Sequence, residues 1–534
     1  MEVEDPHLNC RADSSSRECA AELAGLRNPF AVNEQPGAFH TTGWLRAFGT
    51  ERSRYAVAAE TTSDIAAAIS FARENKVGLG IRGTGHDYMG RSRGAHSLLL
   101  WTHALRDIEV HEAFVPSGAV MEGDDSAVPA VTVGAGTRWL EVYQALAPHG
   151  RFVVGGGCTS VGAAGGFVQG GGFSSFTKDY GTAAGNVLEI EVVTADGETL
   201  VANARRHPVL FWALRGGGGG TFGVASKVTY RTHPMPLTIT GAAGSIRASN
   251  DTDYRALIRR VVRLFPDLND LHWGETIRFG PDNSIELSMA AVDLDDEVAG
   301  AVWRPLLDWV ARRPDAYSSD AYIASGPFTR FWDAARWDET APQMIRHDDR
   351  RGPQSPLFWW DSNDDEVSQY VDAFASRWIP AGLFAESPDI LADVLFGMSR
   401  CWFFHLHANK GVAGAPDDVL ERERLTSLNP SALEAAALLI IGSTQPRAFP
   451  GIPGHEPDQQ VAAVRARRVG EAMDLLQALT PGSGSYVNQA DYFEHEWQRS
   501  FWGSNYPKLL EAKALYDPDN LFRVHHGVGS EGTS

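Results

Sequence analysis

Three glycine-rich stretches constrain this chain more than any other feature of its sequence. They begin at Gly83, Gly155 and Gly216, and each follows a short apolar run that is typical of a β-strand. Glycine has no Cβ atom, so its backbone can approach a ligand closely and adopt positive φ angles. Bare N–H groups at the end of a strand form nests for anionic groups. The pattern therefore predicts a large ligand with an anionic part, such as a pyrophosphate, cradled by main chain.

The length and the uneven composition indicate two domains. A chain of 534 residues is too long for one ordinary hydrophobic core. Glycine thins out beyond about residue 236, where tryptophan becomes frequent. We predict an extension over residues 1–50, a glycine-rich domain over 51–236, a second domain over 237–475, and a segment over 476–534 that packs back onto one of the others.

Local patterns in the glycine-rich half alternate between helix and strand. Residues 62–75 read as a helix capped by Thr62-Ser63-Asp64, and 139–146 as a second helix ended by Pro148. Residues 1–50 look irregular, and 116–129 look like a loop insertion. Strands are expected in the following ranges: 77–82, 131–136, 151–154, 186–194, 199–201 and 224–231.

Charge and hydropathy argue against some classes of partner. The formal net charge of −20 should repel nucleic acid and anionic lipid surfaces. No apolar run approaches the roughly 20 residues that a membrane span needs. The acidic N-terminus does not resemble a secretory signal. We expect a cytoplasmic protein if Met1 is the native start, and a secreted one if a signal has been removed.

The four cysteines, Cys10, Cys19, Cys158 and Cys401, form no CxxC pair. A structural zinc site is therefore not expected, and no other metal motif is present. Cys10 and Cys19 enclose a short polar loop. They either form a disulfide in an oxidising compartment or remain two free thiols in a tail.

Other motifs compete for the first glycine stretch. Residues 85–92 resemble a phosphate-binding loop, but Arg91 stands where that loop requires lysine. Gly90-Arg-Ser-Arg-Gly94 matches the pattern of a serine-hydrolase elbow, which needs a strand immediately before the serine and a helix after it. A serine hydrolase remains a remote alternative on this pattern. No stretch matches the dinucleotide-binding fingerprint of a Rossmann fold.

The glycine stretches also carry a family resemblance. Arg82-Gly-Thr-Gly-His86 resembles the first flavin loop of the vanillyl-alcohol-oxidase/PCMH superfamily, in its berberine-bridge-enzyme-like branch. Gly157-Cys158-Thr-Ser-Val-Gly162 is similar to the second loop of that branch. Residues 180–187, 210–217 and 221–224 resemble its later elements in the same order.

The end of the chain continues the resemblance. Residues 486–491, 505–510 and 516–518 are similar to the berberine-like C-terminal segment, and 528–531 to a fungal isoamyl-alcohol-oxidase-like subgroup. The resemblance implies an α+β fold. In it, a PCMH-type FAD-binding domain over 51–236 is joined by the returning segment 476–534. A central substrate domain over 237–475, with an antiparallel sheet and covering helices, completes the fold.

The resemblance implies FAD as the cofactor, attached twice. His86 stands where bicovalent members bond the flavin 8α-methyl group, and Cys158 where they bond C6. Val161 stands where a valine is typical of oxidases, because it leaves O₂ access to the reduced ring. The other positions implied to bind FAD are Arg82, Gly83, Thr84, Gly85, Gly157, Gly162, Gly165, Gly166, Asn186, Gly223 and Val224.

The implied reaction is the oxidation of an alcohol-type carbon in a small-molecule substrate, either a carbohydrate or a natural product. Hydride passes to flavin N5 and then electrons pass to O₂, giving H₂O₂. Tyr486, oriented by Asn488, is the candidate base, and His405 and His407 share one face of a predicted strand. A flavin dehydrogenase or an oxidative cyclase of secondary metabolism is the alternative.

Overall fold

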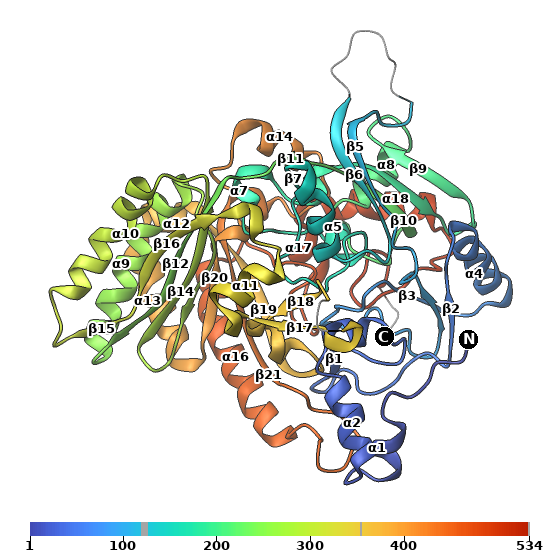
Figure 1. The fold of residues 1–534 in the computed structure, drawn as a ribbon, viewed down its shortest axis with the longest axis horizontal. Coiled ribbons are helices and arrows are strands. Elements are labelled where there is room, and N and C mark those ends of the chain that lie inside the picture. Colours follow the sequence, from blue (N-terminus) through green and yellow to red (C-terminus); the bar gives the residue numbers. More distant parts are fainter. Residues whose placement is uncertain (119–126, 353–354, 532–534) are drawn as a thin grey trace.

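The structure is a computed structural model that describes residues 1–118, 127–352 and 355–531. Figure 1 shows two bodies side by side, a large sheet with its helices on the left and the glycine-rich part on the right. Helices and strands are mixed along the whole chain, which confirms the predicted α+β class. The residue limits of the four predicted regions remain predictions.

The first glycine stretch follows a small parallel sheet of three strands. The strand order is β2-β4-β3, with β2 at Tyr55–Ala58, β3 at Leu79–Arg82 and β4 at Leu98–Trp101. Helix α4 (Thr62–Asn75) crosses from β2 to β3, as predicted. Its cap lies one residue before the predicted position: Thr61 and Asp64 form a reciprocal capping box.

A five-stranded antiparallel sheet forms the rest of the glycine-rich body, with the order β5-β6-β10-β8-β9. Its strands are β5 (Ile108–Phe114), β6 (Val128–Gly134), β8 (Val187–Val193), β9 (Thr199–Asn203) and β10 (Val224–Arg231). Helix α5 (Trp139–Leu146) has the predicted limits, whereas β7 (Arg151–Phe152) is shorter than predicted. Of the predicted loop insertion 116–129, residues 119–126 lie outside the described part.

The second body is built on a nine-stranded sheet that is largely antiparallel. Its order is β1-β19-β21-β20-β13-β14-β12-β15, and β16 also pairs with β12. The strands are β1 (Thr41–Trp44), β12 (Thr238–Ala248), β13 (Gly274–Phe279), β14 (Ser284–Val292), β15 (Tyr317–Ser319), β16 (Tyr322–Pro327), β19 (Gln369–Pro380), β20 (Phe404–His407) and β21 (Ala435–Gln445).

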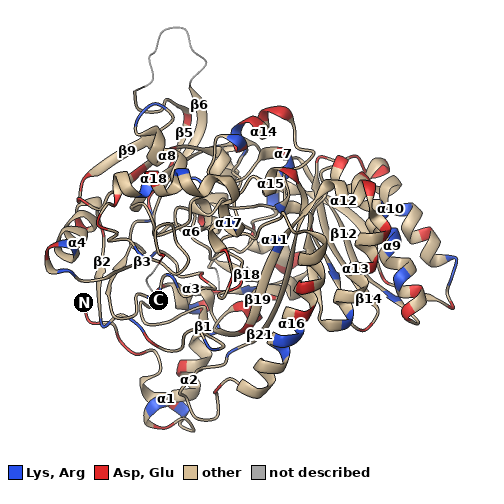
Figure 2. Cartoon of the chain, turned by 180° about the vertical axis from the view of Figure 1, so that it is seen from behind, with Lys and Arg blue, Asp and Glu red and all other residues tan. Residues whose placement is uncertain are grey.

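Four long helices cover this sheet and bury its core. They are α9 (Asp251–Asp270), α10 (Asp296–Ala311), α13 (Pro388–Cys401) and α16 (Gln459–Leu479), whose apolar faces join sheet residues in one buried cluster. Their outer faces carry acidic and basic side chains side by side (Figure 2). In the described residues, no helix is both long and apolar enough to cross a bilayer.

The remaining elements are short. The helices are α6 (Gly166–Gln169), α7 (Thr177–Tyr180), α8 (Pro208–Ala213), α11 (Ala334–Thr340), α12 (Ala381–Glu386), α14 (Asp417–Arg424), α15 (Ser431–Glu434), α17 (Trp497–Trp502) and α18 (Tyr506–Tyr516). The strands are β11 (His233–Pro234), β17 (Ile345–His347) and β18 (Phe358–Trp360). Helix α18 packs against α8, so the end of the chain returns to the glycine-rich body.

The N-terminal region is more ordered than predicted. It forms helices α1 (Leu8–Ala12), α2 (Arg17–Gly25) and α3 (Pro29–Asn33) before strand β1, so the prediction of an irregular segment was wrong. The helices are too short to give a periodic signal, and buried contacts with distant segments hold them in place. Cys10 and Cys19 form a disulfide, which settles the alternative left open by the sequence.

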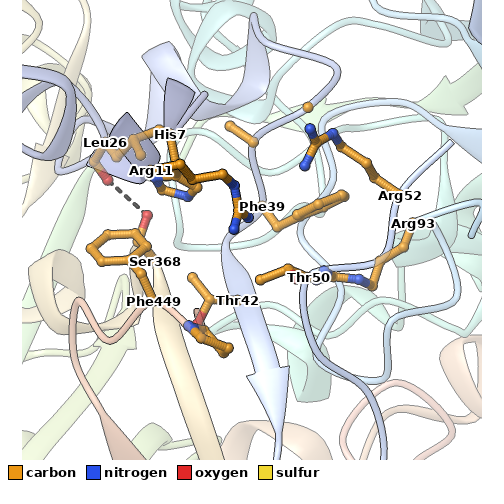
Figure 3. A pocket seen from close by; sticks show the side chains of 13 residues that line it. His7, Arg11, Leu26, Phe39, Thr42, Thr50, Arg52, Arg93, Ser368 and Phe449 are labelled. Carbon is orange, nitrogen blue, oxygen red and sulfur yellow. Dashed lines mark hydrogen bonds between the residues drawn. The ribbon is translucent and has the colours of Figure 1, made fainter. Parts of the chain in front are cut away.

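The N-terminal region closes over the junction between the two bodies. The Ser368 hydroxyl donates a hydrogen bond to the Leu26 carbonyl (2.9 Å), and the Arg93 guanidinium stacks on Phe39 with 3.8 Å between the guanidinium carbon and the ring centroid (Figure 3). The cavity between them holds about 20 Å³. That is room for about one water molecule, so this cavity is not a cofactor site.

Candidate active site

The fold brings the three glycine-rich stretches together. The Thr84 hydroxyl accepts a hydrogen bond from the Gly162 amide (2.9 Å), which joins the first stretch to the second. The carbonyl of Gln169, in α6, accepts from the amides of Gly216 (3.0 Å) and Gly218 (2.9 Å), which joins the second to the third. The third stretch follows helix α8 rather than a strand, so the prediction of a strand before it was wrong. Three loops that are far apart in the sequence thereby build one continuous main-chain surface.

The second stretch leaves room for a ligand at specific glycines. A Cβ atom added at Gly157, Gly165 or Gly166 would meet nothing within 4 Å, and Gly157 and Gly166 are exposed on the loop surface. A Cβ added at Gly155 would lie 2.3 Å from the Trp139 ring. The open positions form a cradle that side chains would fill, and this fits a planar cofactor that approaches the main chain.

His86 and Cys158 lie at one end of this cradle and share a neighbour. The His86 Nε2 atom is 2.9 Å from the Ser160 hydroxyl, and the Cys158 Sγ atom is 3.8 Å from the same hydroxyl. Burial, assisted by the charge of Arg82, lowers the pKa of His86 to about 3, so its imidazole is neutral. Burial raises the pKa of Cys158 to about 12, although the Ser160 contact acts in the opposite direction.

Two of the predicted cofactor residues use their side chains elsewhere. The Arg82 guanidinium donates to the carbonyls of Pro36 (2.9 Å) and Ala38, so it holds the N-terminal region. The Asn186 amide donates to the carbonyls of Tyr180 and Thr182, both at 2.8 Å, and so fixes the turn before β8. Their main chains are also engaged, since the Arg82 carbonyl accepts from the Thr102 amide (2.9 Å) and the Asn186 amide N–H donates to the Thr182 carbonyl (3.2 Å).

The other predicted positions are distributed along the loops. Gly83, Thr84 and Gly85 follow β3 directly, and Val161 lies between Cys158 and Gly162 with its carbonyl accepting from the Trp139 amide (3.0 Å). Gly223 packs against β8, where an added Cβ would lie 2.7 Å from the Val192 side chain. Val224 begins β10 and is buried. These two positions are thus explained by packing.

Tyr486 and Asn488 reach the cradle from the C-terminal segment. The Asn488 amide donates to the Gly166 carbonyl (2.8 Å) and to the Tyr486 phenol oxygen (3.2 Å). The Tyr486 ring packs edge-on against Phe173. Burial raises the pKa of Tyr486 to about 12, so this phenol keeps its proton at neutral pH and is a weak candidate for a base.

His405 and His407 lie on β20 with their rings 6.0 Å apart, consistent with the shared face that the sequence predicts. Burial lowers the pKa of both, that of His405 to about 4. The positive charge of Lys410 also acts on His407, whereas that of Arg278 acts on His405. Both histidine rings are therefore neutral, and each has a different positive side chain as its neighbour. In the described residues, no group of three metal-ligating side chains is present.

Glu366, which no sequence pattern marks as a site residue, joins the two bodies at this point. The Tyr88 hydroxyl, two residues after His86, donates to the Glu366 carboxylate (3.2 Å). Burial raises the pKa of Glu366, whereas the Tyr88 hydrogen bond and the charge of Lys410 lower it. The Glu366 residue is exposed, so its carboxyl group is accessible to a small molecule beside the Tyr88 hydroxyl. No local pattern marks it, because its partner is 278 residues away.

Two residues of the N-terminal region also belong to the site and were not predicted. The His40 ring stacks on the His86 ring, with centroids 3.6 Å apart. Asn33 accepts from His40 Nε2 (2.6 Å) and donates to the Ser160 carbonyl (2.8 Å). The Asn-Pro dipeptide at residues 28–29 marks a helix start, but nothing local indicates the partners of Asn33.

Of the two adjacent tryptophans of the second body, Trp359 and Trp360, one lies in the core and the other at the glycine loops. Trp359 is buried in an apolar cluster, whereas the Trp360 indole donates to the Gly157 carbonyl (2.9 Å) and secures the second glycine stretch. The serine-hydrolase elbow is excluded, because Ser92 follows turns rather than a strand, and no helix follows it before β4. The geometry around this loop is that of a binding site, not of a nucleophile.

Comparisons with known proteins agree with this geometry. A family model described as FAD binding domain matches residues 53–203, and one described as berberine and berberine like matches 485–529. The FAD-linked oxidoreductase ZEB1 of Gibberella zeae is 33% identical over 96% of this chain and 82% of its own length. The chain belongs to the berberine-bridge-enzyme-like FAD-linked oxidoreductases. The family predicted from the glycine loops is confirmed.

Solved structures similar to this FAD-linked oxidoreductase have the same fold. The VAO-type flavoprotein MtVAO615 of Myceliophthora thermophila superimposes with a TM-score of 0.80 at 27% identity, covering 99% of this chain and 92% of that one. The glucooligosaccharide oxidase of Acremonium strictum, which carries a 6-S-cysteinyl, 8α-N1-histidyl FAD, gives 0.66 at 18% identity over 92% and 94%. At that identity the second likeness concerns the fold alone.

Proposed function

We propose that this FAD-linked oxidoreductase is an oxidase whose flavin is attached to both His86 and Cys158. The observation that carries the proposal is the convergence of these two side chains on the Ser160 hydroxyl, at 2.9 Å and 3.8 Å. Two potential attachment residues from separate loops thus lie beside one open cradle. The double linkage of the glucooligosaccharide oxidase gives the proposal a precedent on the same fold.

Bound FAD would accept a hydride at N5 and pass the electrons to O₂, giving H₂O₂. The chain's own residues would hold the ring and manage the protons. Loop main chain at Gly157, Gly165 and Gly166 would lie against the cofactor, where no Cβ stands in the way. We infer that residues 51–236 and 476–534 bind FAD and that 237–475 cover the substrate side.

The substrate would be an alcohol-type carbon of a carbohydrate or a natural product. Solved oxidases of this fold include a chitooligosaccharide oxidase and the carbohydrate oxidase of Microdochium nivale. We infer that Glu366 removes the hydroxyl proton, since it is the carboxylate beside Cys158 and Tyr88. Tyr486, with Asn488, would donate a hydrogen bond to the substrate, and His407 would accept one.

The decisive experiment is mass mapping of peptides from the denatured and digested protein. We expect one FAD to link the peptides of His86 and Cys158, and peroxide to form when a substrate from a panel of sugars and alcohols is oxidised in air. Flavin on one peptide would contradict the double linkage. Turnover with an artificial acceptor but no peroxide in air would indicate the dehydrogenase alternative.

A further inference from the structure

The Ser160 hydroxyl touches both atoms that must lose a proton when the flavin becomes attached. Ser160 is completely buried. Its Oγ atom lies 2.9 Å from His86 Nε2 and 3.8 Å from Cys158 Sγ. Within the described part of the chain these two atoms are its hydrogen-bond partners, so the hydroxyl serves no other side chain.

The contact with His86 selects one form of its imidazole. Burial lowers the pKa of His86 to about 3, so the ring is neutral and carries one N–H group. The partner of one ring nitrogen decides which nitrogen carries the proton. If Nε2–H donates to Ser160, Nδ1 keeps a free lone pair and can form a bond to carbon. Once Nδ1 has formed that bond, Nε2 must release its proton, and Nε2 is the atom beside the hydroxyl.

The contact with Cys158 completes the same arrangement. A hydroxyl can accept from one neighbour and donate to another at the same time. Accepting from His86 Nε2 leaves the Ser160 O–H free to donate to the sulfur of Cys158. Burial opposes ionisation of this thiol, and a donor at the sulfur counteracts that effect. One side chain therefore favours the reactive form of both attachment residues.

We propose that Ser160 is a positioning residue that prepares His86 and Cys158 for flavin attachment and relays the protons that they release. The inference rests on the proposed double linkage. At His86, an imidazole N–H and a C–H of the 8α-methyl group are replaced by a C–N bond. At Cys158, the thiol S–H and the C–H at C6 are replaced by a C–S bond. Each linkage releases two protons and two electrons, which O₂ accepts to form H₂O₂.

Asn33 and His40 restrain the positions of Ser160 and His86. Asn33 donates to the Ser160 carbonyl (2.8 Å) and accepts from His40 Nε2 (2.6 Å). The His40 ring stacks on His86 with centroids 3.6 Å apart. The amide of Asn33 thus connects the serine to the ring that supports the histidine. This arrangement limits the rotation of both partners of the Ser160 contact.

The test is the rate of covalent flavin attachment, measured without any substrate. Full-length protein from a riboflavin-limited host is mixed with FAD in air and quenched with acid at intervals. Flavin that remains with the precipitated protein is counted and assigned to peptides by mass. We expect Ser160→Ala to slow attachment by about 10²-fold, the scale of a lost proton-transfer group. Reversible FAD binding, measured before attachment, should remain near the wild-type value.

A matched control separates this role from a structural one. Thr159, the preceding residue, is equally buried, and its hydroxyl donates to the Phe358 carbonyl (2.6 Å) instead of meeting an attachment residue. Thr159→Val should keep the wild-type rate. If Ser160→Ala does not fold, Ser160→Thr and Ser160→Val form an isosteric pair, of which only the threonine variant should attach flavin quickly.

Each outcome has a separate meaning. Attachment by Ser160→Ala at the wild-type rate, or equal rates for the threonine and valine variants, would overturn the role of Ser160. Loss of reversible binding as large as the loss of attachment would assign Ser160 a structural role and also overturn it. Wild-type protein that attaches no flavin would instead contradict the proposed double linkage itself.

Discussion

Burial sets the protonation state of the groups around the cradle. His86 is neutral because its pKa falls to about 3, and Tyr486 keeps its proton because its pKa rises to about 12. Glu366 differs from both, since its pKa is raised from the ordinary value of a carboxyl group, and a general base works best when its pKa lies near the operating pH. It is therefore the best placed of the three to exchange a proton during turnover.

Replacing Glu366 by glutamine should remove the base and keep the shape. We expect substrate oxidation to fall by about 10²- to 10⁴-fold, with the flavin content unchanged. The measurement is the rate of flavin bleaching when substrate is added without O₂. Asp365→Asn is the matched control, because that exposed carboxylate pairs with Arg447 at 3.4 Å and should leave the rate unchanged. A Glu366→Gln variant with wild-type kinetics would exclude the proposed base.

The same carboxyl group predicts a dependence on pH. A base acts only when ionised, so kcat/KM should fall as the pH drops through the pKa of Glu366. Burial raises that pKa, while Tyr88 and Lys410 oppose the rise, so the fall should begin above the pH at which an exposed glutamate titrates. In Glu366→Gln this acidic limb should be absent from the residual activity. A limb that persists unchanged would assign the titration to another group.

The size of the side chain at position 161 should control the rate at which the reduced flavin reacts with O₂. Val161 lies between Cys158 and Gly162, and part of its side chain is exposed. Leucine adds one methylene group and should narrow the approach to the ring. We expect Val161→Leu to slow reoxidation in air by about tenfold or more, a loss of about 1.4 kcal/mol of transition-state stabilisation. Val161→Ala should keep the wild-type rate, and equal rates for all three proteins would remove the oxidase argument from this residue.

At the scale of elements, two glycines of the second loop differ in the space that surrounds them. A Cβ at Gly155 would lie 2.3 Å from the Trp139 ring, whereas a Cβ at Gly157 would meet nothing within 4 Å. Gly155→Ala should therefore lower the thermal midpoint of the protein. Gly157→Ala should leave the midpoint of the flavin-free protein unchanged but weaken FAD binding, measured by titration. The reverse pattern would show that the open positions do not face the cofactor.

Local signals account for the elements that were predicted correctly. Helices α4 and α5 have caps and apolar faces within one short segment, and residues 188–192 of β8 alternate between apolar and acidic side chains, so each could be located from sequence. The loops were found because glycine marks them. Asn33 and Glu366 were missed because their partners are 127 and 278 residues away. Ser160 lies inside a recognised loop, but only the fold shows that its hydroxyl also reaches His86 in the first loop.

For the whole molecule, a buried lysine fastens the two bodies together. Lys178 lies on α7, and its ammonium group donates to Asn269 Oδ1 (2.6 Å) on α9. It also donates to the carbonyls of Gly411 (3.1 Å), Ala413 (3.3 Å) and Ala436 (3.1 Å). All of these acceptors belong to the body that holds the large sheet. One buried amino group, whose pKa burial lowers to about 7, therefore shares its three N–H groups among four oxygens of the other body.

Replacing Lys178 by methionine should weaken that junction. The four acceptors lose their donor, and we expect the free energy of unfolding to fall by about 1–3 kcal/mol. The measurement is the urea midpoint, together with hydrogen exchange of α7 and of the residues after β20. Lys227→Met is the control, because Lys227 is exposed on β10 and its replacement should change little. Equal midpoints for the two variants would contradict the role of Lys178.

Segments from opposite ends of the chain meet at the flavin loops. Asn33 reaches Ser160, while Asn488 reaches Gly166, and Arg91 donates to the carbonyls of Val487 and His525. A growing polypeptide therefore lacks part of the cradle until residues 485–529 have left the ribosome, roughly half a minute to two minutes after initiation. Cofactor capture must follow synthesis, so yellow protein in a cell would report only chains that were translated to the end and folded.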